Sequence, residues 1–90
     1  MRFLVLIEYT DMDARARTVD AHRAYLAQGR ASGIVADSGP FVDGAGGMYV
    51  LEVRDEAEAR AFVDADPYRK DGGLALTVRG YKSALDVKRD

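Results

Sequence analysis

Residues 2–9, RFLVLIEY, carry apolar side chains at almost every position. The run is too short for a signal-peptide core or a membrane span, and its pattern favours a β-strand. One face of this strand would hold Phe3, Val5, Ile7 and Tyr9, and the other would hold Leu4 and Leu6. A strand that is apolar on both faces is covered on both faces, so the sequence predicts a layered fold.

The segment after this strand predicts a long helix. Thr10-Asp11-Met12-Asp13 has the pattern of a capping box, and its acidic residues suit a helix N-terminus. The helix should run from about residue 13 to residue 31 and stop at Gly33. Helical spacing predicts one buried stripe, which consists of Arg15, Val19, His22, Leu26 and Gly29.

A β-hairpin should follow this helix. Residues 34–41 predict a strand that is interrupted by Ser38-Gly39-Pro40, and residues 48–53 predict its partner. Residues 43–47 form the glycine-rich turn between them. These glycines resemble a phosphate cradle only weakly, because no helix start follows them and no Lys-Ser/Thr pair closes a P-loop.

The remaining residues predict a second helix and a last strand. Asp55 is the expected N-cap, with Glu58 three residues on, and the helix should end near residue 64. Pro67 prevents a simple continuation and biases Asp66 away from helical geometry. Residues 74–82 predict the last strand, and the polar residues 83–90 should extend past the sheet.

The predicted order is therefore β-α-β-β-α-β in a single domain over residues 1–90. This is the ferredoxin-like α+β arrangement, an antiparallel sheet with both helices on one face. The other face is left open, although three of the four strands carry apolar residues on both faces. The same face of a second copy is the economical cover, so we expect a homodimer whose two sheets pack together.

Composition excludes several classes of function. The 90 residues include 13 Lys+Arg and 15 Asp+Glu, and the net charge of -2 gives no basic excess for binding nucleic acid. The absence of cysteine removes disulfides and thiolate chemistry and fits a reducing compartment, so we expect a cytoplasmic protein. One histidine is too few for a zinc site, no acidic cluster has ligand spacing, and no haem or flavin motif is present. We therefore expect no metal, no cofactor and no membrane partner.

His22 is the only histidine, and it lies on the apolar stripe of the first predicted helix. An imidazole titrates near neutral pH, so at the edge of a core it is a candidate for proton transfer. The alternative is a histidine that only hydrogen-bonds a backbone carbonyl. Asp66 is the candidate partner, which would orient the imidazole and stabilise its charged form; its alternative role is to form a turn or cap.

Ser38 and Tyr68 are candidates for contacting a substrate. Ser38 shares a strand face with Ile34 and Ala36, and so it would face the helix layer that carries His22. A Ser-His-Asp hydrolase is not favoured, because the sequence has no nucleophile elbow and no evident oxyanion hole. Tyr68 follows Asp66 closely and would line the same pocket, whereas the other tyrosines are expected in the core or an interface.

Several of these pieces resemble the YCII-related (YciI-like) family. They are Phe3-Leu4-Val5-Leu6, His22-Arg23-Ala24-Tyr25-Leu26, Gly29, Gly33, Ser38-Gly39-Pro40-Phe41 and Ala65-Asp66-Pro67-Tyr68. The resemblance implies a dimeric α/β barrel with an active site built on a histidine and an aspartate, which are His22 and Asp66 here. It also implies that Ser38 matches a small or hydroxyl residue before Gly-Pro. One branch of the family is similar to a dehydrochlorinase of chlorinated hydroxyquinols.

We therefore expect a small cofactor-independent enzyme of the lyase or isomerase type. His22 would be the general acid or base, Asp66 would hold the imidazole, and Ser38 and Tyr68 would contact oxygens of a small cyclic or aromatic-derived substrate. The alternative is a non-catalytic dimeric module that binds a small ligand or assists another protein. Two observations distinguish the enzyme from the non-catalytic module: the distance between His22 and Asp66, and whether a pocket encloses them.

Overall fold

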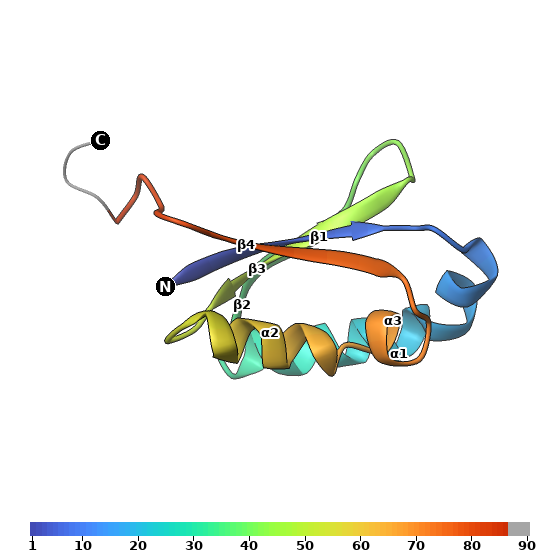
Figure 1. The fold of residues 1–90 in the computed structure, drawn as a ribbon, viewed down its shortest axis with the longest axis horizontal. Helices are drawn as coiled ribbons and strands as arrows, with labels where there is room; N and C mark the ends of the chain where they lie inside the picture. The colour runs from blue at the N-terminus through green and yellow to red at the C-terminus, as the bar shows by residue number, and fades with distance from the viewer. Residues whose placement is uncertain (87–90) are drawn as a thin grey trace.

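The computed structural model describes residues 1–86 and has the order β1-α1-β2-β3-α2-α3-β4 (Figure 1). The strands are Arg2–Glu8 (β1), Val35–Pro40 (β2), Gly46–Glu52 (β3) and Ala75–Tyr81 (β4). The helices are Met12–Ala31 (α1), Glu56–Asp64 (α2) and Pro67–Lys70 (α3). The predicted extension over residues 83–90 lies partly outside the described residues.

The four strands form one sheet in the order β2-β3-β1-β4, in which each strand is antiparallel to its neighbours. All three helices lie against one face of this sheet (Figure 1). The predicted ferredoxin-like fold is therefore confirmed. None of the helices within residues 1–86 is long and apolar enough to cross a membrane.

The two faces of β1 differ in burial as the alternation predicts. Phe3, Val5 and Ile7 face the helices and are at most 5% exposed. On the opposite face Leu4 is half-buried and Leu6 is 37% exposed. The sheet thus presents apolar surface on the side without helices, and the homodimer that would cover it stays a prediction.

The N-cap of α2 was predicted correctly, whereas the N-cap of α1 was not. Asp55 is the N-cap of α2, and its carboxylate accepts a hydrogen bond from the Glu58 backbone N–H at 2.9 Å, as predicted. The N-cap of α1 is Asp11, whose carboxylate accepts from the Ala14 backbone N–H at 3.0 Å. The capping box that begins at Thr10 was therefore wrong by one residue.

The structure also corrects the face assignment in β2. A β-bulge between Val35 and Asp37 shifts the register, so Val35 pairs with Leu51 while Ser38 pairs with Tyr49. Because a bulge adds one residue, it reverses the alternation that follows it. Ser38 therefore shares the helix-facing side with Val35, and not with Ala36, which is exposed.

The helix α3 was not predicted. Pro67 does stop α2, which ends at Asp64, and Asp66 has the extended backbone expected before a proline, with φ -64° and ψ 126°. A proline is also well suited to the first position of a new helix, because its φ is already helical and its missing N–H is not needed there. One short helix therefore begins immediately, and it carries Tyr68 into the core.

Candidate active site

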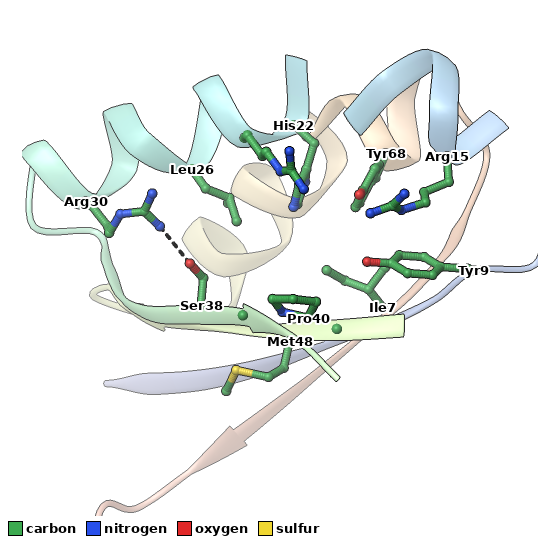
Figure 2. Close-up of a pocket in the computed structure, with 13 residues that line it drawn as sticks. Ile7, Tyr9, Arg15, His22, Leu26, Arg30, Ser38, Pro40, Met48 and Tyr68 are labelled. Atoms are coloured by element: carbon green, nitrogen blue, oxygen red, sulfur yellow. Dashed lines mark hydrogen bonds between the residues drawn. The ribbon is translucent and has the colours of Figure 1, made fainter. Parts of the chain in front are cut away.

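The buried face of α1 brings His22 to the core. The fully buried positions of this helix are Ala14, Thr18, His22, Leu26 and Gly29. Arg15 and Val19, which the spacing placed on this stripe, are only half-buried, so the stripe is rotated by one residue in its first turns. The consequence is that Arg15 lies at the edge of the stripe, from which its side chain reaches a neighbouring pocket (Figure 2).

Asp66 is the N-cap of α3, and its side chain is completely buried. Its Oδ1 accepts from the Tyr68 backbone N–H at 2.9 Å and lies 2.8 Å from Nδ1 of His22. Its Oδ2 accepts from the Tyr49 hydroxyl at 2.9 Å. A buried carboxylate is costly unless donors replace its water, and here three donors do so.

These contacts determine which nitrogen of His22 is free. An ionised carboxylate can only accept hydrogen bonds, so Nδ1 of His22 carries the proton in this pair. In the neutral ring Nε2 then holds a lone pair, and it makes no hydrogen bond with any residue in the described range 1–86. The arrangement leaves a basic nitrogen on the side of the imidazole that faces away from Asp66.

The ring of Tyr68 holds the imidazole from one side. The two ring centroids are 3.7 Å apart and the planes are inclined by 10°, which is a stacked geometry. Burial is the main cause that raises the pKa of Tyr68 to about 12, and the neighbouring Tyr9 hydroxyl adds to this effect. Burial and the charge of Asp66 also raise the pKa of Tyr49 above its ordinary value. Both tyrosines are therefore neutral phenols at physiological pH.

A pocket of about 300 Å³ opens between α1 and the β2-β3 side of the sheet (Figure 2). His22, Tyr68 and Ser38 all line it, whereas Asp66 lies behind His22 and does not. The Ser38 hydroxyl accepts a hydrogen bond from Nη1 of Arg30 at 2.6 Å, which leaves its own proton free for another acceptor. The volume is at the lower end for small-molecule sites and is enough for one substituted ring.

The structure thus brings together the four residues singled out from the sequence, although their catalytic roles stay a prediction. It adds Tyr49 and Arg15, which were not assigned to a site. Alternation along β3 places Tyr49 on the inner face, but nothing in the sequence links it to Asp66, 17 residues away. Within residues 1–86 no group of three or more His, Cys, Asp or Glu side chains is arranged to hold a metal ion.

The fold agrees with what the chain matches among known proteins. Residues 1–79 match the YCII-related domain, and the chain therefore belongs to this family. No curated protein matches it by sequence.

A solved structure is similar over the full length of both chains. It is the 5-chloro-2-hydroxyhydroquinone dehydrochlorinase TftG from Burkholderia phenoliruptrix AC1100, in complex with 2,5-dihydroxybenzoquinone. The two chains share 25% sequence identity, each is covered to 100%, and the TM-score is 0.77. This similarity supports a small, enzyme-like function for the chain.

Proposed function

We propose that this protein is a small cofactor-independent enzyme of the lyase or isomerase type, in which His22 moves a proton on a small cyclic substrate. The observation that carries the proposal is the 2.8 Å contact between His22 Nδ1 and the buried Asp66 Oδ1. Packing alone does not require a buried carboxylate at this position, and a charge there costs stability. An aspartate that aligns an imidazole at a pocket wall is typical of general acid–base catalysis.

The proposed chemistry starts at Nε2 of His22. Asp66 holds the proton on Nδ1, so Nε2 accepts a proton from a hydroxyl or an acidic C–H of the substrate. In an elimination the electron pair that the proton leaves behind forms a new double bond, the leaving group departs with its own bonding pair, and the imidazolium then gives its proton to water. In an isomerisation the imidazolium returns the proton to another atom of the substrate. The charge of Asp66 stabilises the imidazolium, and the stacked face of Tyr68 adds a favourable cation–π contact.

Ser38 and Tyr68 are the proposed contacts to substrate oxygens. The Ser38 hydroxyl lies on the β2 wall of the pocket, and Tyr68 lies beside His22 on the helix side. Both residues line the pocket together with His22 and come from different elements, so in the proposal a ring that contacts both lies beside the imidazole. This is the orientation that proton transfer needs.

The similar structure suggests which compounds to try first. TftG is a dehydrochlorinase of 5-chloro-2-hydroxyhydroquinone, so hydroxylated and chlorinated six-membered rings are the substrate class we propose for this chain. We also propose that the protein acts as a homodimer through the open sheet face, where Leu6, Phe41 and Tyr81 are exposed by 37%, 40% and 41%.

The test is turnover of a panel of such rings, followed as chloride release and as the change in quinone absorbance. His22→Gln and Asp66→Asn should each lower the rate by about 10²–10⁴-fold, the usual contribution of a positioned acid–base group. Arg17→Gln is a matched control, because Arg17 lies on the same helix, is exposed and does not line the pocket. Wild-type rates in folded His22→Gln would refute the proposal. Binding without any turnover in the wild type would favour the non-catalytic module instead.

A further inference from the structure

The pocket that contains His22 is cationic. Three arginines of α1, Arg15, Arg23 and Arg30, line it together with His22, and none of the described residues that line it is acidic. The chain as a whole has a net charge of -2, so this concentration of positive charge is local. It is not a consequence of the overall composition.

These arginines are also without carboxylate partners. Elsewhere Arg54, Arg60 and Arg69 each pair with an acidic side chain. Across residues 1–86, none of the three pocket arginines forms an ion pair. Unpaired guanidinium groups that share a cavity with an apolar wall attract anions and bind them more strongly than they would in bulk water.

Arg15 is the arginine best placed to meet a bound ligand. Its guanidinium lies over the ring of Tyr9, with 4.9 Å from Cζ to the ring centroid, and its Nε is buried without a hydrogen-bond partner. Figure 2 shows the side chain beside Tyr9 and Tyr68 at the pocket. Arg15 precedes His22 by seven residues, which is about two turns or roughly 10 Å along the same side of the helix.

Arg30 is less suitable for this task. One of its nitrogens already donates to Ser38 at 2.6 Å, and Figure 2 shows it at the end of the pocket away from Arg15. Arg23 follows His22 directly, so it points about 100° around the helix from the imidazole.

We propose that the pocket selects an anionic ring, whose negative oxygen binds Arg15 while another edge of the ring meets His22. This inference rests on the proposed function and adds the charge of the substrate to it. A ring oxyanion of either kind fits, whether it is an ionised ring hydroxyl or a ring carboxylate. The guanidinium would form charge-assisted hydrogen bonds with the oxygen, and Tyr9, over whose ring the guanidinium lies, would contact the ligand ring beside it.

The test compares ligands of similar size and different charge by isothermal titration calorimetry at neutral pH. The first pair is 2,5-dihydroxybenzoquinone, a vinylogous acid that is anionic under these conditions, and hydroquinone, which is neutral. The second pair is benzoate and benzamide, which separates a carboxylate from a ring hydroxyl as the source of the charge. The wild type should bind the anion of at least one pair about tenfold more tightly than its neutral counterpart.

Variants assign the preference to Arg15. Arg15→Met should weaken binding of the preferred anion by about tenfold and leave the neutral counterpart within about twofold. Arg15→Lys should keep part of the preference, because it keeps the charge but loses the planar geometry. Arg17→Met is the control and should bind like the wild type. Thermal melts of each variant establish that it is folded.

Three results would overturn the inference: equal affinity for anions and neutral rings, an equal loss of both in Arg15→Met, or no binding of any probe. The outcome is separable from that of the proposed function. If His22→Gln retains full turnover while the anion preference still depends on Arg15, the acid–base proposal fails and the inference stands. If His22→Gln abolishes turnover and Arg15→Met leaves the preference unchanged, the inference fails alone.

Discussion

Replacing Asp66 by asparagine is the perturbation for which the structure predicts the most. The asparagine side chain has the same shape, but it offers one acceptor oxygen where the carboxylate offers two. With the amide oxygen in the place of Oδ1, the bonds from His22 and from the Tyr68 backbone survive in neutral form. The amide nitrogen then faces the Tyr49 hydroxyl, which must rotate its proton away to accept instead of donate.

The expected loss of stability follows from the change of a charged acceptor to a neutral amide. A hydrogen bond to a charged group contributes about 1.5–3 kcal/mol and a neutral one about 1 kcal/mol, while the amide escapes the cost of burying a charge. We therefore expect the free energy of unfolding to fall by about 1–3 kcal/mol, which lowers Tm by several degrees in a domain of this size. Urea unfolding followed by circular dichroism measures it.

The same variant gives a sharper result when it is combined with His22→Leu, which removes the imidazole and leaves no donor at this position for residue 66. Because the two side chains are in contact, their effects should not add, and the double-mutant cycle should show a coupling energy of about 0.5–3 kcal/mol. A distant pair, Asp66→Asn with Arg17→Gln, serves as the additive reference. Unchanged stability in Asp66→Asn together with additivity in the His22 cycle would refute the charged, hydrogen-bonded pair.

Three further outcomes are expected. Tyr68 keeps its proton in the folded state up to its pKa of about 12, whereas in the unfolded chain it ionises near its ordinary value of 10.0. Its contribution to the free energy of unfolding should therefore be constant below pH 10 and fall between pH 10 and 12. Alkaline denaturation of the wild type and of Tyr68→Phe would measure the difference. Gly29→Ala should lower the free energy of unfolding by about 1–3 kcal/mol, because the new Cβ would lie 2.6 Å from Cγ2 of Val35. Stability equal to the wild type would contradict this close packing. Leu6→Lys should convert a dimer to a monomer in sedimentation analysis with little change of helix content; a wild type that sediments as a monomer would end the dimer prediction.

The architecture could be predicted because it depends on patterns that are local. Alternation in residues 2–9 identifies a strand that is apolar on both faces, and the Asp55 cap identifies the start of α2. Hydrophobic spacing along α1 places His22 on the buried side, although it is one residue off at Arg15. Each of these features is determined within a few residues of the chain.

The details of the site depend on contacts that are not local. His22 and Asp66 are 44 residues apart, and residue types alone do not give the distance between them. The role of Tyr49 depends on the register between β1 and β3, and the side to which Ser38 points depends on a single bulge. A bulge leaves no clear composition signal, and one extra residue is enough to reverse a strand face.

Asp66 starts α3 and also aligns the imidazole, so one carboxylate serves the backbone and the proposed chemistry at once. If Asp66 is replaced, a loss of activity has two explanations: the imidazole is no longer aligned, or the connection from α3 to β4 is less stable. His22→Gln avoids this ambiguity, because a glutamine amide can still donate to the carboxylate and leaves the start of α3 unchanged. Under the proposed function, that substitution is therefore the suitable variant for trapping whatever compound the protein binds in a cell extract.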